Sequence, residues 1–330
     1  MKKNSSDNVP VYIKMSGRMG NQMFRYAFAR WLMVRGKCRG KLYIDFSNIR
    51  MENSKGEMEG WVDALKDLSV MPYDSGSPAD DPLWKQTTLW EKMCLAVIFI
   101  ADRPFKGKET GKRLRMRRRF LPWLDRHGIY LLFTGYDYPF NPSGSRRKIV
   151  SGPFECARYC EEIRDVLLKE FRPVHPVLEK NREFLGKIRE RQSVCVTIRR
   201  GNYLAYPHLN VCTQEYFEDA AREMRKRIKD PLFVVFSDDI AWARDHLKFP
   251  GETIYETGDD PLWEKMRLMS ACRHFIISNS TFSWWAQFLG EDPEKLVIAP
   301  DHWFNDTYQP PLYQKNWITL KVRKAEVQAE

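Results

Sequence analysis

The sequence lacks an apolar run long enough to cross a membrane. The longest such run in its 330 residues, 93–101, is about half the length that a transmembrane helix requires. The polar residues at its start precede no apolar core of a secretory signal. We therefore expect a cytoplasmic protein, whose membrane association, if any, is peripheral contact at the inner face.

The sequence also lacks the paired cysteines of a disulfide-rich or zinc-binding fold. Its 7 cysteines are scattered, and two of them, Cys195 and Cys272, fall within expected strands or helices. Cys156 and Cys160 have helical spacing, but no second pair of Cys or His residues accompanies them. This pattern is typical of a reduced compartment and predicts neither disulfides nor a structural zinc ion.

Negative charge is scarce relative to positive charge. The chain holds 54 Lys and Arg against 43 Asp and Glu, and the net charge of +11 indicates an anionic partner. Many basic residues form a run around 103–119: Arg103, Lys106, Lys108, Lys112, Arg113, Arg115, Arg117, Arg118 and Arg119. The run has two interpretations. It is an attachment surface, which binds anionic lipid headgroups or an acidic acceptor, or it is a solvated helix face, which is the commoner case. No helix-turn-helix, zinc-finger or RNA-binding signature accompanies it, so we expect no nucleic-acid partner.

Length and composition predict a globular protein of two domains. A hydrophobic content of 43% and 11 Trp exclude a disordered chain, and the length favours two domains. Pro173 and Pro176 mark a hinge. We therefore expect an N-terminal α/β domain at 1–172, with the basic run as an insertion, and a C-terminal domain at 173–330.

The N-terminal part opens with a strand, a loop, a helix and a second strand. The first strand is expected at 11–15, the glycine loop at 16–21 and the second strand at 42–45. The loop has neither the glycine spacing of the dinucleotide fingerprint nor the Gly-Lys-Ser/Thr of a P-loop. The pattern then becomes less regular, and the elements that it predicts are a strand at 129–134 and helices at 83–101, 154–171 and 177–191.

Strands and helices alternate regularly in the C-terminal part. Short apolar runs predict strands at 193–198, 232–236, 253–255, 274–277 and 296–299. We expect Thr213 and Asp260 to cap helices, with Pro261 at a first helical position. This alternation predicts a doubly wound parallel sheet.

Polar clusters follow three of these strands. They are Arg199-Arg200-Gly201, Ser237-Asp238-Asp239 and Ser278-Asn279-Ser280-Thr281. Ligands of such a sheet bind outside the carboxyl ends of its strands. Two forked guanidinium groups suit a diphosphate, a helix N-terminus suits an anion, and a carboxylate suits a base amide or a ribose hydroxyl. Each cluster alone also fits a helix cap or a surface loop, but the three together indicate a nucleotide-sugar enzyme.

Three stretches resemble motifs of the alpha-1,2-fucosyltransferases of glycosyltransferase family 11. Residues 17–27 are similar to the Gly-x-x-Gly-Asn-Gln start of that family, and residues 196–203 to its His-x-Arg-Arg-Gly-Asp-Tyr motif. Residues 276–286 resemble its Ser-Asn-Ser-Thr-Phe-Ser-Trp-Trp block, the most specific of the three. The similarity extends from about Val11 to Asp306.

The resemblance implies a GT-B-like fold, with two Rossmann-type domains facing across a cleft. It implies an inverting enzyme that transfers L-fucose from GDP-fucose to the 2-hydroxyl of a terminal galactose, in a surface glycan or a free or lipid-linked oligosaccharide. Neither a cofactor nor a metal is expected. The domain at 1–172 would face the acceptor, and the domain at 173–330 would bind GDP-fucose.

The resemblance also implies roles for individual residues. Arg199 and Arg200 would be catalytic, because they would neutralise the diphosphate leaving group. The residues implied in donor binding are Gly17, Gly20, Asn21, Thr197, Asn202, Asp238, Asn279, Ser280, Thr281 and Ser283.

Two positions depart from the family pattern. Thr197 stands where the family has His, and Asn202 where it has Asp. A Thr hydroxyl replaces at most one hydrogen bond, and an Asn is not a base. Two alternatives therefore stay open. The protein is a transferase that uses a different nucleotide sugar as donor, or it is a nucleotide-sugar-binding protein that has lost catalysis. A general base would lie elsewhere, and Asp45 is a candidate. The favoured interpretation of Asp45 is nevertheless a structural residue at a strand end or turn.

Overall fold

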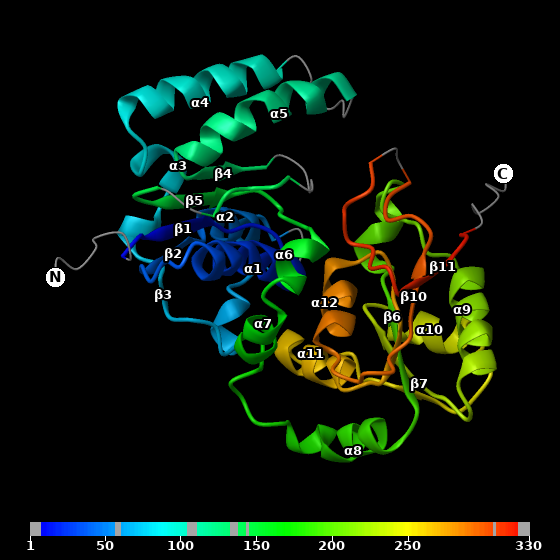
Figure 1. The fold of residues 1–330 in the computed structure, drawn as a ribbon. Helices are drawn as coiled ribbons and strands as arrows, with labels where there is room; N and C mark the ends of the chain where they lie inside the picture. The colour runs from blue at the N-terminus through cyan, green and yellow to red at the C-terminus, as the bar shows by residue number, and fades with distance from the viewer. Residues whose placement is uncertain are drawn as a thin grey trace. The chain divides into compact units, whose positions relative to one another are not determined.

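The computed structural model describes residues 8–56, 61–103, 111–132, 138–142, 145–305 and 308–322, without the side chains of 111–115. The chain forms two compact units, which we describe separately (Figure 1). Unit 1 comprises Met1–Lys66 and Val70–Glu170, and unit 2 comprises Asp67–Ser69 and Phe171–Glu330. The division thus falls between residues 170 and 171, and a short earlier segment pairs with unit 2 through backbone hydrogen bonds from Ser69 to Arg172 and from Val174 to Asp67.

Unit 1 is built on a five-stranded sheet with the order β3-β2-β1-β5-β4, in which all neighbouring strands are parallel. The strands are β1 (Val11–Lys14), β2 (Leu42–Asp45), β3 (Tyr73–Asp74), β4 (Ile129–Leu131) and β5 (Lys148–Ser151). The chain leaves the central β1 toward β2, whereas β5 lies on the other side of β1. The topological switch point of unit 1 is therefore between β1 and β5.

The long helix α1 (Met19–Arg35) is the central helix of unit 1. Its apolar side chains are buried except Val34 in the last turn, and the ring of Phe28 stacks on that of Phe154 with centroids 4.0 Å apart. The other helices of unit 1 are α2 (Ser47–Lys55), α3 (Pro82–Lys85), α4 (Leu89–Asp102), α5 (Gly111–Arg126), α6 (Ala157–Glu161) and α7 (Arg164–Glu170).

Unit 2 is built on a six-stranded parallel sheet with the order β11-β10-β9-β6-β7-β8. The strands are β6 (Ser193–Ile198), β7 (Leu232–Ser237), β8 (Thr253–Tyr255), β9 (His274–Ile276), β10 (Val297–Pro300) and β11 (Ile318–Leu320). This is the strand order of the dinucleotide-binding fold, with its switch point between β6 and β9. The predicted GT-B-like class, with two Rossmann-type α/β domains and a doubly wound C-terminal sheet, is confirmed.

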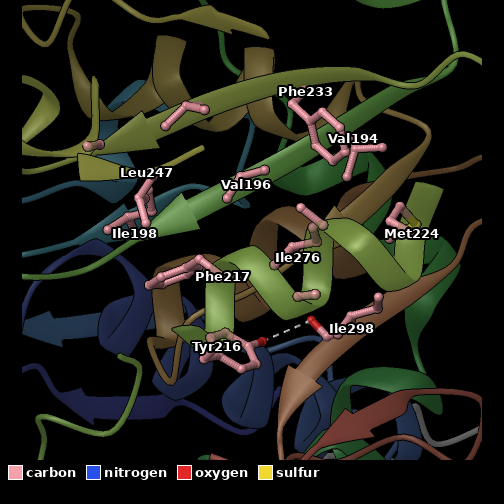
Figure 2. Close-up of a cluster of buried hydrophobic side chains, with 14 of the residues drawn as sticks. Val194, Val196, Ile198, Tyr216, Phe217, Met224, Phe233, Leu247, Ile276 and Ile298 are labelled. Carbon is pink, nitrogen blue, oxygen red and sulfur yellow. Dashed lines mark hydrogen bonds between the residues drawn. The ribbon is translucent and has the colours of Figure 1, made fainter. Parts of the chain in front are cut away.

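Helix α9 (Gln214–Arg227) packs on one face of the unit 2 sheet (Figure 2). Val194 of β6 and Phe217 of α9 belong to one buried apolar cluster between them. Thr213 caps α9 as predicted, since its hydroxyl accepts a hydrogen bond from the Tyr216 N–H at 3.3 Å. The other helices of unit 2 are α8 (Arg182–Glu190), α10 (Ile240–His246), α11 (Leu262–Ser270) and α12 (Thr281–Leu289), with 3-10 turns at Glu179–Asn181 and Gly201–Ala205.

Three helix predictions are wrong in extent. The region 83–101 holds two helices, α3 and α4, because Thr88 starts a new helix with a capping box to Glu91. The region 154–171 is likewise divided, into α6 and α7, and its first residue, Phe154, has a left-handed φ of 49° that does not continue a helix. The region 177–191 starts as a 3-10 turn before α8.

The predicted cap at Asp260 is also wrong. Pro261 is the N-cap residue of α11, and the buried Asp260 carboxylate instead accepts a hydrogen bond from Asn181 Nδ2 at 2.8 Å. Strand β5 was not predicted, because it begins with Lys148, a residue that ordinarily lies at the surface. The buried Lys148 Nζ donates a hydrogen bond to the Pro142 carbonyl at 2.7 Å, which gives one of its N–H groups an acceptor inside the unit. None of the described helices is long and apolar enough to cross a membrane.

Candidate active site

Arg199 directly follows β6 at the switch point of unit 2. Its Nη1 lies 2.9 Å from Asp238 Oδ2, and its Nη2 donates to Asn202 Oδ1 at 2.9 Å. The guanidinium carbon lies 5.5 Å from the centre of the Tyr203 ring, within cation–π range. The side chain is 24% exposed. Arg199 is therefore oriented by three neighbours and still reaches the surface.

Arg200 is positioned mainly by an aromatic face. Its guanidinium carbon lies 3.5 Å from the centre of the Trp242 ring. Its Nε lies 3.5 Å from Asp239 Oδ2 without a hydrogen bond to it or to any other group in the described chain. Stacking on an indole leaves the edge of a guanidinium to further acceptors. Arg200 is thus preorganised without a close, fully formed ion pair.

The two acids after β7 anchor the arginine loop. Asp238 accepts the Arg200 backbone N–H at 2.8 Å in addition to pairing with Arg199. A Cβ on Gly201 would lie 2.5 Å from Asp238 Oδ2, so glycine lets the carboxylate approach the loop. Asp239 caps α10 by accepting the Trp242 N–H at 3.1 Å, which is the cap alternative weighed from the sequence. Both carboxylates thus bind protein groups in this structure.

Helix α12 begins just beyond the end of β9. Ser280 is its N-cap residue and makes no side-chain capping bond, and Thr281 is the first helical residue. The buried hydroxyls of Ser278 and Ser283 bond to each other at 3.1 Å, within the turn. The first N–H groups of a helix have no intrahelical acceptors, and the helix dipole favours negative charge there. Ser280 and Thr281 therefore lie at an end suited to an anion, whereas Ser283 stabilises the turn.

Asn279 is a buried clamp between two loops. Its side chain is 2% exposed. Its Nδ2 donates to the carbonyls of Leu209 and Trp303, both at 2.9 Å, and its Oδ1 accepts from the Cys212 thiol at 3.6 Å. Burial raises the pKa of Cys212 to about 12, so the thiol keeps the proton that it donates. The Asn279 side chain thus ties the loop after β6 to the end of β9.

Thr197 is also turned inward. It is 3% exposed, and its hydroxyl accepts the Ser278 N–H at 3.2 Å and donates to the Ile276 carbonyl at 3.5 Å. These bonds join β6 to β9 next to the arginine loop. Of the two departures from the family pattern, Thr197 therefore lies within the sheet and Asn202 lies against Arg199.

Two aromatic residues of the site were not predicted. The Tyr203 hydroxyl donates to the Asn279 carbonyl at 3.4 Å while its ring lies against Arg199, so Tyr203 links the two strand ends. The available signal for Tyr203 was its place as the last residue of the arginine motif. Trp242, which supports Arg200, carried no signal beyond being an aromatic residue in the first turn of a helix.

The glycine loop of unit 1 leads from β1 into α1. Gly17 has a φ of 81°, and a Cβ there would lie 2.7 Å from the Asn21 Cβ. Gln22 is fully buried, and its amide makes three hydrogen bonds of 2.8 to 3.1 Å to backbone groups of Gly17, Val62 and Ala64. Of the three predicted donor residues of unit 1, Gly17 therefore lies in the turn that Gln22 fixes, and Gly20 and Asn21 lie in the first turn of α1.

Asp45, the candidate base, lies at the end of β2 with an exposure of 1%. Its Oδ1 accepts the Ser47 N–H at 2.8 Å, and its Oδ2 accepts the Asp81 N–H at 3.2 Å. Both oxygens thus hold backbone turns, which agrees with the interpretation favoured from the sequence.

The fold and this site together define a class: a Rossmann-type α/β protein with two arginines and a helix N-terminus at a switch point. Across the described part of the chain, no group of three His, Cys, Asp or Glu side chains is arranged to hold a metal ion. The sequence model of Glycosyl transferase family 11 matches residues 88–321, more than half of the chain. The chain belongs to this family and is a glycosyltransferase, as its three motifs predicted.

Several characterised proteins are similar in sequence. The O-antigen biosynthesis glycosyltransferase WbnK of Escherichia coli is 25% identical over 94% of this chain and all of its own length. An alpha-1,2-colitosyltransferase of Escherichia coli is 33% identical over 52% of the chain, and the galactoside 2-alpha-L-fucosyltransferase Sec1 of Mus musculus is 28% identical over 68%. The chain spans 62% and 63% of the lengths of these last two proteins.

Solved structures of similar fold have low sequence identity. The fucosyltransferase NodZ from Bradyrhizobium has a TM-score of 0.47 and 14% identity, over 89% of this chain and 97% of its own. A family 9 glycosyl transferase from Veillonella parvula has a TM-score of 0.42 and 12% identity, over 97% and 88%.

Proposed function

We propose that this glycosyltransferase moves L-fucose from GDP-fucose to the 2-hydroxyl of a terminal galactose, with inversion. The observation that carries the proposal is the oriented pair Arg199 and Arg200 at the strand end next to the start of α12. The names of the relatives support a 1,2-linkage and a galactoside acceptor. The O-antigen relative supports a surface glycan or its oligosaccharide precursor as the acceptor.

Stabilisation of the leaving group is the main catalytic contribution in this proposal. As the bond from fucose C1 to the diphosphate oxygen breaks, negative charge develops on the diphosphate. Arg199 and Arg200 stabilise this charge by charge-assisted hydrogen bonds. The galactose hydroxyl attacks C1 from the opposite face and loses its proton. The sugar is oxocarbenium-like in the transition state, because its bond to the diphosphate is largely broken there. The reaction rate therefore depends most on positive charge that stabilises the departing diphosphate.

The other residues of the motifs divide into binding and positioning roles. We assign phosphate binding to Ser280, Thr281 and the first N–H groups of α12. Asn202 and Asp238 position Arg199, and Thr197, Asn279 and Ser283 position the strand ends from within. Gly17, Gly20 and Asn21 contribute to donor binding from unit 1, as the family resemblance implies.

A divalent metal is not required in this mechanism, because the two guanidinium groups supply the positive charge that a metal would otherwise provide. The test is to incubate the purified protein with GDP-fucose and an array of galactosides, with EDTA or with Mg²⁺. We expect 1,2-linked fucose on a galactose in both conditions. No transfer to any galactose acceptor would contradict the proposal, and transfer only with Mg²⁺ would contradict the metal-independent mechanism.

A second candidate function is transfer of a different nucleotide-linked sugar. The 33% identity to a colitosyltransferase favours colitose as that sugar. Thermal shifts and transfer assays with a panel of GDP- and UDP-linked sugars, colitose included, distinguish the two donors. Binding of GDP-fucose with neither transfer nor hydrolysis would instead indicate a non-catalytic relative.

The basic run keeps two interpretations. Arg103, Arg118 and Arg119 are exposed, whereas Arg117 is 5% exposed and pairs with Asp102 at 2.7 Å. Lys106 and Lys108 lie outside the described residues, as do the side chains of Lys112, Arg113 and Arg115. Contact of residues 103–119 with anionic lipid therefore stays a proposal, and the run is at least in part a solvated helix face with one structural arginine.

A further inference from the structure

Helix α4 of unit 1 exposes an apolar stripe. Five of the twelve large hydrophobic side chains that are exposed in the described chain lie on this one helix: Leu89 at 76%, Trp90 at 63%, Met93 at 55%, Val97 at 58% and Ile100 at 59%. At 3.6 residues per turn, these positions fall within an arc of roughly 100°. Contiguous apolar surface of this kind marks an interaction site rather than a solvated helix face.

The opposite face of α4 already holds the helix to its own unit. Leu95 and Ile98 are buried, and α4 packs against α5 (Figure 1). Both carboxylates of the helix are also bound: Glu91 pairs with Arg147 at 2.6 Å, and Asp102 pairs with Arg117 at 2.7 Å. The exposed stripe is therefore not needed for packing within unit 1, and it carries no carboxylate.

Exposed arginines lie at the end of α4 and on the neighbouring helix α5. Arg103 follows α4 directly and is exposed, and Arg118 and Arg119 are exposed on the neighbouring α5. An apolar face on a unit with exposed arginines nearby is complementary to a bilayer surface with anionic headgroups, which takes up apolar side chains and attracts cations. A second copy of this chain would bring a second set of arginines to the same stripe, and their repulsion disfavours that partner.

We propose that the α4 stripe (Leu89, Trp90, Met93, Val97 and Ile100) docks unit 1 on the surface of an anionic lipid bilayer. At 14 residues, α4 is about 21 Å long, shorter than the roughly 30 Å apolar core of a bilayer, so it lies in the interface rather than across it. The apolar stripe inserts below the headgroups, and the flanking arginines bind them. The proposal concerns a surface of unit 1 alone and does not depend on the sugar that the enzyme transfers.

Vesicle flotation tests the apolar half of the proposal. The full chain is mixed with vesicles of phosphatidylcholine containing phosphatidylglycerol, without sugar substrates. We expect the wild type to float, and a Met93→Ser/Val97→Ser variant to bind about tenfold more weakly. The matched control is Met51→Ser/Val34→Ser, which removes the same residue types at 51% and 38% exposure elsewhere in unit 1 and should float like the wild type. Circular dichroism and thermal unfolding verify that each variant is folded.

Vesicles with and without an anionic headgroup test the role of the arginines. We expect Arg118→Gln/Arg119→Gln to lose the preference for phosphatidylglycerol over phosphatidylcholine alone, whereas Arg222→Gln/Arg225→Gln, on the exposed face of α9, should keep it. A wild type that stays with the unbound fraction would overturn the proposal, as would an α4 variant that floats as well as its control. Sedimentation that shows a wild-type dimer and a monomeric α4 variant, without vesicle binding, would assign the stripe to a second copy instead.

Discussion

The two units each place a polar turn at the centre of a parallel sheet, and the two turns differ in charge. In unit 1 the turn at Gly17 follows β1, and in unit 2 the turn at residues 278–281 follows β9. Each turn is held by a buried amide with three hydrogen bonds to the surrounding chain: Gln22, from the first turns of α1, in unit 1 and Asn279 in unit 2. The same device thus shapes both turns.

The strands beside the two turns make the difference. Across the switch point of its sheet, β9 pairs with β6, which is followed by Arg199 and Arg200. The corresponding partner of β1 is β5, which ends at Ser151 before Gly152. A diphosphate needs positive charge more than shape. Turns of similar construction thus have different neighbours, and we place the charge chemistry of the proposed reaction in unit 2.

The largest expected effect comes from removing that charge. Arg199→Ala and Arg200→Ala should each lower kcat by about 10²–10³, because each removes a guanidinium that we propose stabilises the leaving group. Initial rates with GDP-fucose and a galactoside measure this, and Arg222→Ala, on the surface of α9, is the control. Near-normal rates in both variants would contradict the proposal that the turn of unit 2 differs from that of unit 1 by its catalytic arginines.

The shared amide clamp predicts an effect on stability in both units. Gln22→Ala and Asn279→Ala should each lower the free energy of unfolding by about 1–3 kcal/mol, because each leaves buried backbone carbonyls without a donor. Denaturant unfolding of the two variants provides the measurement. An Asn279 variant of full stability that no longer binds GDP would show that this residue contacts the ligand, and the analogy between the two turns would fail.

A smaller effect is expected from Asn202, which departs from the family pattern. Asn202→Ala should lower kcat/KM by roughly tenfold, since Arg199 loses one of its two polar side-chain partners at 2.9 Å. Asn202→Asp should keep the activity, because a carboxylate oxygen accepts the same bond. If the Asp variant were as slow as the Ala variant, Asn202 would act on the sugar and not through Arg199.

The smallest predicted effect is a pH dependence of stability that arises from His274 in unit 2. His274 begins β9, where its Nδ1 accepts the Leu296 N–H at 3.1 Å and its Nε2 lies 3.1 Å from Gln192 Oε1, so the neutral ring fits. Burial lowers its pKa from the ordinary 6.5, so the unfolded chain binds this proton more readily than the folded one. Stability should therefore be kept above about pH 6.5 and fall below it.

Thermal unfolding between about pH 7.5 and about pH 5.5 checks this prediction. The wild type should lose more melting temperature on acidification than His274→Gln, which has no ring to protonate. An equal loss in the two proteins would place the acid-sensitive groups elsewhere.

The regular part of the fold could be predicted because unit 2 alternates short apolar runs with capped helices. The misses have local physical causes. Strand β5 was missed because it begins with Lys148, and the sequence does not distinguish a buried lysine with a carbonyl partner from a surface lysine. The expected helix at 154–171 begins later because Phe154 has a left-handed φ.

For the site, the sequence identified the residues but not the direction of their side chains. Arg199 and Thr197 are neighbours in one motif, yet one reaches the surface and the other bonds across the sheet. Tyr203 and Trp242 orient the arginines through contacts that the fold creates. The motif included Tyr203 but did not reveal its contact with Arg199, and no spacing revealed Trp242.

Recognition of the diphosphate by Arg199 and Arg200 can be measured by separate calorimetric titrations of the protein with GDP and with GMP. The wild type should bind GDP about a hundredfold more tightly than GMP, because GMP lacks the second phosphate. In Arg199→Ala and Arg200→Ala this preference should fall toward equality, while the affinity for GMP changes little. Variants that keep the full preference for GDP would contradict the account.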